Sequence, residues 1–339
     1  MAAVLVDSYG RKINYLRISL TDACNFKCVY CVPPSGFSLM DRSCYLSRQE
    51  IVRLIRLASG VGIERVRLTG GEPLLRQDLV EIVRDIKQET SIKDLSITTN
   101  GSRLGGLLQP LKDAGLDRIN ISLDSLDPER FKQVTLSNAY HQVLESTYDA
   151  LEIGFPVKLN MVALKGLSAE EIICFVQLAV DYPFEVRFLE FMPLCGSGWY
   201  PDLVFPITDI RSIVNARFFL EEETERKDQA AQTFSIVGGK GRVGFIASLT
   251  ESFCDQCSRI RMTADGRIRP CLFSEVEVPL GQLLHQNAAD EEIVAGLQEA
   301  VRIKPAGNQF RNQPFKINGQ NSSTSDDIPS TIVMRSLGG

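Results

Sequence analysis

Residues 65–73 read RVRLTGGEP, a short strand followed at once by a glycine-rich turn. Successive side chains of a strand point to opposite faces, so Arg65 and Arg67 share one face while Val66 lies on the other. The paired glycines allow the backbone to approach a ligand closely. The stretch therefore predicts a strand with one polar and one apolar face, ending at a ligand-binding loop.

Five further segments have the periodicity of strands, and helical segments separate them. The strands are expected near residues 15–20, 95–99, 118–123, 157–164 and 185–191. The helices are expected near residues 46–59, 76–88, 104–114, 141–152 and 168–180, the last with a capping-box pattern at Ser168 and Glu171. Strands that alternate with helices predict an α/β protein with a parallel sheet. Six units are too few for a complete eight-fold barrel, so an open six-unit barrel or a doubly wound sheet fits.

The polar strand faces predict a wet cavity. Parallel strands that are buried on both faces are normally apolar throughout, yet four of the other strands repeat the split into a polar and an apolar face. A sizeable polar ligand would explain such an interior. The alternative is an antiparallel sheet with one face in solvent, against which the helical crossovers argue.

Three cysteines, Cys24, Cys28 and Cys31, lie within the eight residues CNFKCVYC, with no fourth cysteine or histidine close by. A cubane iron–sulfur cluster normally takes four thiolates, so three leave one iron without a protein ligand. A small molecule can then bind there, as at the open position of catalytic zinc. The alternative is a structural zinc site completed by His141 or His285.

A second triad has the spacing C-x2-C-x13-C and consists of Cys254, Cys257 and Cys271. Between the pair and the single cysteine, two alternating segments flank an Asp-Gly turn, which predicts a β-hairpin. A hairpin would bring Cys271 back beside the pair. The triad therefore predicts a second open cluster, with half of a zinc ribbon as the alternative. Of the remaining cysteines, Cys174 lies in an apolar run and is expected in the core.

Basic residues gather on the polar strand faces and beside the second triad. They are Arg17, Arg65, Arg67, Lys158, Arg259, Arg261 and Arg269. Unpaired guanidinium groups in a cavity are costly, and a phosphate-rich ligand would satisfy them. The alternative is that carboxylates of the same chain, such as Glu190 and Asp124, pair with them.

The composition limits the remaining possibilities. The net charge of −5 gives no overall basic field for nucleic acid, and hydrophobic residues make up 44% of the chain, enough for a large core. The first residues lack the basic leader of a signal peptide, and no apolar stretch is long enough to span a membrane. Nine cysteines outside a secretory context indicate metal binding or catalysis. We expect a soluble protein of the reducing cytoplasm; the alternative from another class is a zinc-stabilised nucleic-acid-binding module.

Together these motifs resemble a known family. The spacing C-x3-C-x2-C with Tyr30 before the last cysteine, followed by GGEP, is similar to that of radical S-adenosylmethionine (SAM) enzymes. The second triad, the nearby Arg259 and Arg261, and a C-terminal Gly-Gly narrow the resemblance to the GTP 3′,8-cyclases of molybdenum cofactor biosynthesis. It extends from Asp7 to the end of the chain.

The resemblance implies a fold and a first cofactor site. Residues 1–225 would form a partial (βα)6 barrel of the radical SAM type, and residues 226–339 a β-rich region that carries the second cluster and a flexible tail ending in Gly338-Gly339. Cys24, Cys28 and Cys31 would bind a [4Fe–4S] cluster whose open iron holds SAM, and reductive cleavage of SAM would give a 5′-deoxyadenosyl radical. The positions that match SAM contacts are Tyr30, Gly71, Ser122 and Met192.

The resemblance also implies a substrate site and a reaction. Cys254, Cys257 and Cys271 would bind a second [4Fe–4S] cluster that meets the guanine base of GTP. The positions that match GTP contacts are Arg17, Arg67, Thr98, Lys158, Arg259 and Arg261, with Arg65 and Arg269 as further candidates. Such a lyase removes hydrogen from C3′ of GTP, and the ribose radical attacks C8 to give (8S)-3′,8-cyclo-7,8-dihydroguanosine 5′-triphosphate. The Gly338-Gly339 tail would reach into the active site.

The implied partners follow from this reaction. They are GTP as substrate, a reductant protein such as flavodoxin or ferredoxin, and cyclic pyranopterin monophosphate synthase as recipient of the product. A homodimer is left open, and neither nucleic acid nor a membrane is expected as a partner. One departure is Ser258, where the family usually has Asn. The alternative within the enzyme class is a radical enzyme that modifies a peptide and carries an auxiliary cluster, although such proteins usually have more cysteines near the C-terminus.

Overall fold

The computed structural model describes residues 4–32, 36, 38–194, 201–223 and 230–308. Six strands follow one another in space in the order of the chain, and each neighbouring pair is parallel. They are β1 (Tyr15–Ser19), β2 (Arg65–Thr69), β3 (Asp94–Thr99), β4 (Arg118–Ser122), β5 (Val157–Ala163) and β6 (Glu185–Glu190). The predicted parallel sheet is confirmed, and the antiparallel alternative was wrong.

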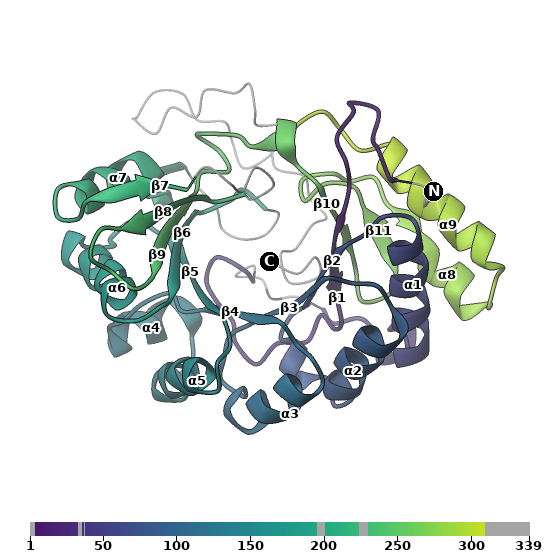
Figure 1. Ribbon diagram of the computed structural model, residues 1–339, viewed down its shortest axis with the longest axis horizontal. Coiled ribbons are helices and arrows are strands. Elements are labelled where there is room, and N and C mark those ends of the chain that lie inside the picture. The colour runs from purple at the N-terminus through teal and green to yellow at the C-terminus, as the bar shows by residue number, and fades with distance from the viewer. Residues whose placement is uncertain (1–3, 33–35, 37, 195–200, 224–229, 309–339) are drawn as a thin grey trace.

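Helices cover one face of this sheet, which curves into an open arc (Figure 1). They are α1 (Arg48–Gly60), α2 (Leu79–Glu89), α3 (Leu108–Asp113), α4 (Pro128–Thr135), α5 (Tyr140–Glu152), α6 (Ala169–Asp181) and α7 (Ile207–Asn215). Short 3-10 turns are η1 (Arg42–Cys44), η2 (Pro73–Leu75), η3 (Gly105–Leu107), η4 (Pro201–Leu203) and η5 (Cys254–Gln256). Helices on one face, with a concave face opposite, make the sheet a partial barrel of the expected type and not a doubly wound sheet.

The C-terminal strands extend the same sheet at both of its edges. On the β6 side lie β9 (Arg242–Ile246), β8 (Gln232–Ile236) and β7 (Leu220–Glu222), and on the β1 side lie β10 (Arg259–Met262), β11 (Arg267–Arg269) and β12 (Val278–Pro279). Strand β9 is parallel to β6, and β10 is parallel to β1. The described residues thus form one twelve-stranded sheet, of which eight consecutive strands are parallel.

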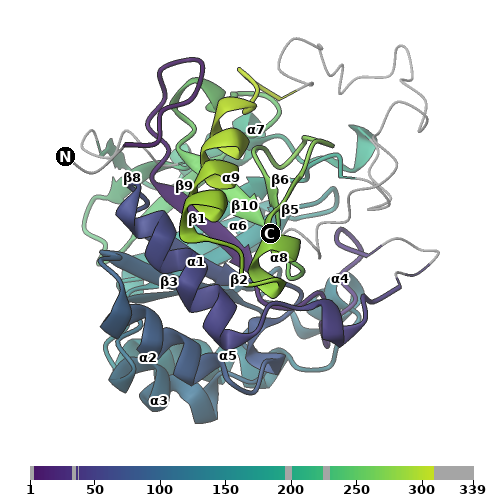
Figure 2. The ribbon, with the colours of Figure 1, turned by 90° about the vertical axis from the view of Figure 1, so that its right-hand side faces the viewer.

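Two further helices, α8 (Leu280–His285) and α9 (Asp290–Arg302), pack against α1 on the outer surface (Figure 2). Neither these two helices nor α4 was predicted from the sequence. Among the described residues, no helix is long and apolar enough to cross a membrane.

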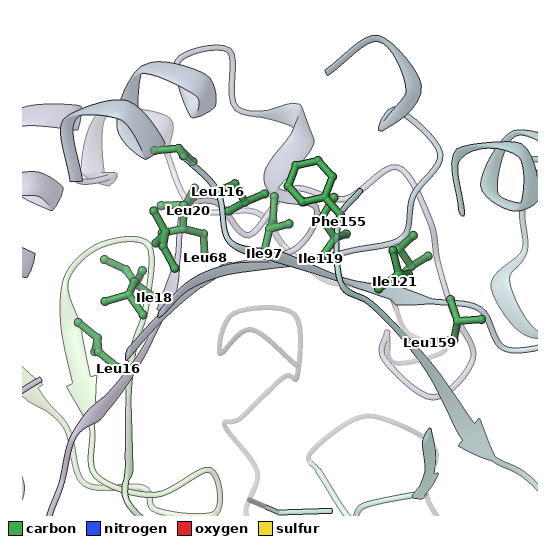
Figure 3. Packing of buried hydrophobic residues seen from close by; sticks show 14 of the residues in the cluster. Leu16, Ile18, Leu20, Leu68, Ile97, Leu116, Ile119, Ile121, Phe155 and Leu159 are labelled. Carbon is green, nitrogen blue, oxygen red and sulfur yellow. The ribbon is translucent and has the colours of Figure 1, made fainter. Parts of the chain in front are cut away.

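The apolar strand faces form the core beneath the helices. Leu16 and Ile18 of β1, Leu68 of β2 and Ile97 of β3 are fully buried, and Figure 3 shows them pointing toward the helical layer. Burying each such side chain contributes about 1.5–3 kcal/mol, so the alternation seen in the sequence decides which face meets the helices. Cys174 was wrongly expected here: it is exposed on α6.

The predicted capping box of α6 is only half formed. The Ser168 hydroxyl accepts a hydrogen bond from the Glu171 backbone N–H at 3.1 Å, as expected. The Glu171 carboxylate instead accepts a hydrogen bond from the Ser125 hydroxyl and pairs with Arg130 at 3.2 Å. Tertiary partners thus replaced the local one.

Candidate active site

A cavity of about 710 Å³ lies against the concave, polar face of the sheet. Its walls come from the polar sides of β1, β2, β5, β6 and β10 and from the segments that carry the second cysteine triad. Six residues predicted to bind the nucleotide line it: Arg17, Arg65, Arg67, Lys158, Arg259 and Arg261. The prediction of a cavity on the polar face of the sheet is therefore confirmed.

The cavity is strongly cationic although the chain is acidic. Among the described lining residues, eleven are Arg or Lys and two, Asp94 and Glu185, are acidic, whereas the whole chain has a net charge of −5. Cations that are concentrated in a concave, low-dielectric site attract anions far more strongly than the same charges spread over a surface. The site is suited to a ligand with several negative charges.

The two acidic residues each neutralise part of this charge. Asp94 accepts a hydrogen bond from Arg118 at 2.7 Å. Glu185 accepts hydrogen bonds from Lys158 at 2.6 Å and from Arg187 at 2.5 Å. Burial, reinforced by the charge of Arg187, lowers the pKa of Lys158 to about 7.

Glu190 and Asp124 do not pair with the cavity cations in the described structure, contrary to the alternative that the sequence left open. Glu190 accepts hydrogen bonds from the backbone N–H groups of Leu249 at 2.8 Å and Thr250 at 3.2 Å. Asp124 accepts one from the Tyr30 hydroxyl at 2.6 Å. The excess of positive charge on the cavity wall therefore remains.

Two arginines of the cavity wall, one half-buried and one buried, are poorly paired. The Nε of Arg17 has no hydrogen-bond partner among the described residues. The Nε of Arg67, a residue that is 5% exposed, reaches the Ser96 hydroxyl at 3.4 Å. Burial lowers the pKa of both guanidinium groups, an effect that Tyr15 opposes. Buried cations in this state gain most from an anionic ligand that accepts their hydrogen bonds.

All three cysteines of the second triad line the cavity. Strands β10 and β11 are antiparallel, as the hairpin prediction required, and Gly266 of the turn has a φ of +81°, which favours glycine. Burial alone would raise the pKa of Cys257, but the charges of Arg259 and Lys304 lower it to about 6. The site therefore stabilises a thiolate.

Two basic side chains hold the backbone around this triad. The Lys304 ammonium, which is 3% exposed, donates to the Arg259 carbonyl at 2.9 Å and to the Pro270 carbonyl at 2.6 Å. Arg11 donates to the Cys254 carbonyl at 2.7 Å. The residues that flank each cysteine are thus joined through side chains that no local motif revealed.

The first triad lies on the loop that follows β1, next to the TGGEP turn. A Cβ on Gly71 would stand 2.1 Å from the Ala23 carbonyl oxygen, so only glycine allows the two loops to meet. The Asn100 amide lies 3.9 Å from the Cys24 sulfur. Burial raises the pKa of Cys28 well above its usual range, and the charges of Asp124 and of the other two thiols add to this effect.

Glu72 fixes the turn to the neighbouring strand. Its carboxylate accepts hydrogen bonds from the Thr99 hydroxyl at 2.6 Å and from the backbone N–H groups of Asn100 at 2.7 Å and Leu74 at 3.0 Å. Burial raises its pKa to about 7, although these hydrogen bonds act in the opposite direction. The acid of the GGEP motif is therefore a structural support for the cysteine loop.

The two histidines considered as zinc ligands make other contacts in the described structure. No three His, Cys, Asp or Glu side chains in the described ranges converge closely enough to hold one metal ion. His285 binds Glu50 at 2.7 Å, and His141 packs its ring against Tyr140 in α5. In a cubane each thiolate binds a different iron, so the three sulfurs of a triad need not meet on one ion.

The end of β6 lies between the first triad and the cavity. Phe191 packs with Tyr30 and with the partly buried Cys28 and Cys31, while the next residue, Met192, lines the cavity. Ser122 ends β4 on the concave side, in register with Asn160, which also lines the cavity. Of the four residues expected to contact SAM, Met192 lines the cavity and Tyr30 packs beside the first triad, and their contact with SAM stays a prediction.

Two residues predicted to bind the nucleotide are not among the described residues that line the cavity. Thr98 lies on the concave face, and its buried hydroxyl has no hydrogen-bond partner in the described chain. Arg269 pairs with Glu277, and its assignment to the nucleotide site stays a prediction. The tail residues Gly338 and Gly339, and Cys195, fall outside the described ranges.

Several residues of the site were missed in the sequence. Arg118 and Arg187 share the polar faces of β4 and β6, so strand alternation could have revealed both. Tyr15 is two residues before Arg17 on β1, so strand alternation places both side chains on the same polar face. Lys304 reaches the site only through tertiary packing, for which the sequence has no local signal.

Comparison with known proteins places the chain among characterised sequences. The model of the radical SAM superfamily matches residues 18–179, and that of the Molybdenum Cofactor Synthesis C family matches residues 184–310. The GTP 3′,8-cyclase of Syntrophomonas wolfei is 42% identical over 91% of this chain and 95% of its own length. The mitochondrial GTP 3′,8-cyclase of Arabidopsis thaliana is 41% identical over 90% of this chain and 79% of its own.

Two further similarities are more limited. Human molybdenum cofactor biosynthesis protein 1 is 39% identical over 93% of this chain, which spans 51% of that longer protein. Among solved structures, Streptococcus suis SuiB bound to S-adenosylmethionine superimposes with a TM-score of 0.58 over 86% of this chain and 69% of its own, at 18% identity. At that identity the likeness shows a shared fold.

Proposed function

This chain belongs to the GTP 3′,8-cyclase family of radical SAM proteins, and we propose that it converts GTP to (8S)-3′,8-cyclo-7,8-dihydroguanosine 5′-triphosphate in the first step of molybdenum cofactor biosynthesis. One observation carries the assignment of the substrate site. The second cysteine triad shares a single cavity of about 710 Å³ with a large excess of Arg and Lys. A purine nucleoside triphosphate needs both a site for its base and cations for its phosphates.

A radical SAM protein holds an iron–sulfur cluster and binds SAM, and we assign both to the loop that carries Cys24, Cys28 and Cys31. When bound, they supply the 5′-deoxyadenosyl radical that removes hydrogen from C3′ of GTP. The close contact of Gly71 with Ala23 holds the turn beside this loop. The Tyr30 hydroxyl donates a hydrogen bond to the Asp124 carboxylate at 2.6 Å, which anchors the loop. We assign Gly71, Tyr30, Ser122 and Met192 to the SAM site.

We further propose a second [4Fe–4S] cluster on Cys254, Cys257 and Cys271, with its open iron toward the guanine. The lowered pKa of Cys257, at about 6, supports thiolate ligation there. The same cavity wall would bind the phosphates through Arg17, Arg67 and Arg261, because these guanidinium groups are buried and suited to bidentate contacts. Lys158, Arg259 and Thr98 would complete the GTP site.

The departure at Ser258 has a structural explanation. Arg65 donates to the Ser258 hydroxyl at 3.1 Å and to the Asn14 side-chain oxygen at 2.7 Å. Ser258 therefore orients a basic side chain on the cavity wall. We propose that Arg65 approaches the phosphates in this orientation.

The partners of the reaction remain proposals that rest on the family. They are a reductant protein such as flavodoxin or ferredoxin, transfer of the product to cyclic pyranopterin monophosphate synthase, and a role for Gly338-Gly339 in the active site. The division of the chain at residue 225 also stays a prediction.

The test is an assay of anaerobically reconstituted protein with GTP, SAM and a reductant. We expect the cyclised nucleotide to form together with 5′-deoxyadenosine and methionine. SAM cleavage without any cyclised nucleotide would contradict the GTP assignment and favour a different radical substrate, such as a peptide. A colourless, zinc-containing protein obtained under strict anaerobiosis would contradict both clusters.

A further inference from the structure

One aromatic ring stands among the arginines of the cavity. Tyr15, the first residue of β1, is 6% exposed and lines the cavity. The guanidinium carbons of Arg65, Arg67 and Arg17 lie 5.1, 5.6 and 5.8 Å from its ring centroid. All three are within the ~6 Å reach of a cation–π interaction.

The arrangement follows from the strand register. Tyr15 lies beside Arg65 of β2 and Arg259 of β10 in the parallel ladder, and Arg17 lies beside Arg67. Three like charges so close together repel one another when they are buried. The electron-rich ring faces these charges and offsets part of that repulsion before any ligand binds.

The hydroxyl of Tyr15 is the second unusual feature. A buried tyrosine hydroxyl normally finds a hydrogen-bond partner, yet no described donor or acceptor meets this one with hydrogen-bond geometry. Arg17 and Arg67 act on it through their charge. The hydroxyl is thus buried next to these charges, and a polyanion in the cavity would act on it through the same charges.

We infer that Tyr15 is a positioning residue for the triphosphate, whose ring holds Arg17, Arg65 and Arg67 in place and whose hydroxyl takes up a proton when the polyanion binds. The inference rests on the proposed GTP site. It adds to that site Tyr15, whose phenol is an acid among the arginines proposed to bind the phosphates.

The direction of the proton transfer follows from the surrounding charges. Burial would raise the pKa of Tyr15, but Arg67, Arg17 and Arg118 lower it to about 7, with Asp94 opposing them. In the ligand-free protein, part of the population therefore holds a phenolate near neutral pH. A bound triphosphate repels the phenolate and returns the pKa toward its usual value of about 10, so a proton is taken up. Affinity for GTP then falls as the pH rises above 7.

The experiment is titration calorimetry of GTP into the anaerobically reconstituted holoenzyme without reductant, from pH 6.5 to 9, in two buffers of different ionisation enthalpy. We compare the wild type with Tyr15→Phe, which keeps the ring, and Tyr15→Leu, which loses it. The control is Tyr9→Phe, because Tyr9 is exposed outside the cavity and faces a single arginine, Arg11, at 5.3 Å. Titration of the γ-phosphate is common to all four proteins and cancels in the comparison.

Wild type should take up about one proton more than Tyr15→Phe when GTP binds at pH 8. For each unit of pH above 7, the GTP affinity of wild type should fall by up to about tenfold relative to that of Tyr15→Phe. Tyr15→Phe should match wild type near pH 6.5. Tyr15→Leu should bind GTP about tenfold more weakly at every pH, while guanosine, which lacks phosphates, binds equally to all variants.

Equal proton uptake by wild type and Tyr15→Phe would overturn the role of the hydroxyl. Unchanged GTP affinity of Tyr15→Leu would overturn the role of the ring. If Tyr15→Leu does not fold, the comparison with Tyr15→Phe still decides the hydroxyl role. A wild type that takes up iron and cleaves SAM but does not bind GTP would overturn the proposed function itself, and this result is distinct from failure of the Tyr15 inference alone.

Discussion

The two cysteine triads have the same ligand chemistry in opposite electrostatic surroundings. Around the first triad, burial and the Asp124 carboxylate raise the pKa of Cys28. At the second, Arg259 and Lys304 overcome burial and lower the pKa of Cys257 to about 6. An acidic environment favours a cationic ligand, and a basic one favours an anionic ligand. The cationic SAM and the anionic GTP therefore each match the charge around the triad to which we assign them.

The largest expected effect separates the two triads by the step that each supports. Cys28→Ala should abolish SAM cleavage and cyclisation by more than about 1000-fold, whereas Cys257→Ala should abolish cyclisation but leave SAM cleavage measurable. Chromatography of 5′-deoxyadenosine and of the cyclised nucleotide from one reaction measures both. Loss of SAM cleavage to the same extent in both variants, with iron still bound at the intact triad, would remove the distinction.

The next largest effect tests the arginines of the cavity that the second triad lines. Arg17→Ala or Arg261→Ala should weaken GTP binding by about 10- to 100-fold, because each removes a buried charge that would contact phosphate. Iron and sulfide per chain should not change. Arg302→Ala is the matched control, since that side chain is 69% exposed and pairs only locally with Glu299. Loss of iron from the cavity variants would show that these arginines are structural.

A smaller expected effect tests the acidic surroundings of the first triad. Asp124→Asn removes the charge that anchors the Tyr30 hydroxyl at 2.6 Å, and it should weaken SAM binding by about tenfold. GTP binding should stay within about twofold of wild type, because Asp124 is not among the described residues that line the cavity. Equilibrium dialysis with each ligand measures the difference. Equal losses for SAM and GTP would mean that the two environments are not independent.

The smallest effect concerns the support of the second triad. Lys304→Met leaves the Arg259 and Pro270 carbonyls without their ammonium donor, at a cost of about 1–3 kcal/mol. The melting temperature of the holoenzyme should fall by about 1–4 °C, with iron lost from the second triad before the first. Lys12→Met is the control because Lys12 is exposed. A melting curve that matches wild type would show that Lys304 is not needed there.

The sequence predicted the parts of the molecule that have local periodicity. Strands β1 to β6 lie within about one residue of the expected ranges because their two faces differ so sharply. The triads and most cavity cations were found for the same reason, since spacing and strand parity identify them. Arg269 lies beside Arg261 in the neighbouring strand, and its ion pair with Glu277 is a contact that strand alternation does not predict.

What the sequence could not predict depends on contacts between distant segments. Nothing in residues 242–246 or 259–262 marks them as partners of β6 and β1, because parallel pairing leaves no turn signal between the strands. Lys304 and Arg11 reach the second triad across more than thirty and two hundred residues respectively. Such residues become visible only when the chain is folded.

The pairing of β9 with β6 and of β10 with β1 has a consequence for how the chain can be divided. A fragment that ended before residue 230 would lack β9 and β10. The backbone N–H and C=O groups on the outer edges of β1 and β6 would then have no pairing strand. Exposed strand edges of this kind join to other copies of themselves. Residues 1–229 therefore do not form a self-contained sheet, because the C-terminal strands cover both of its edges.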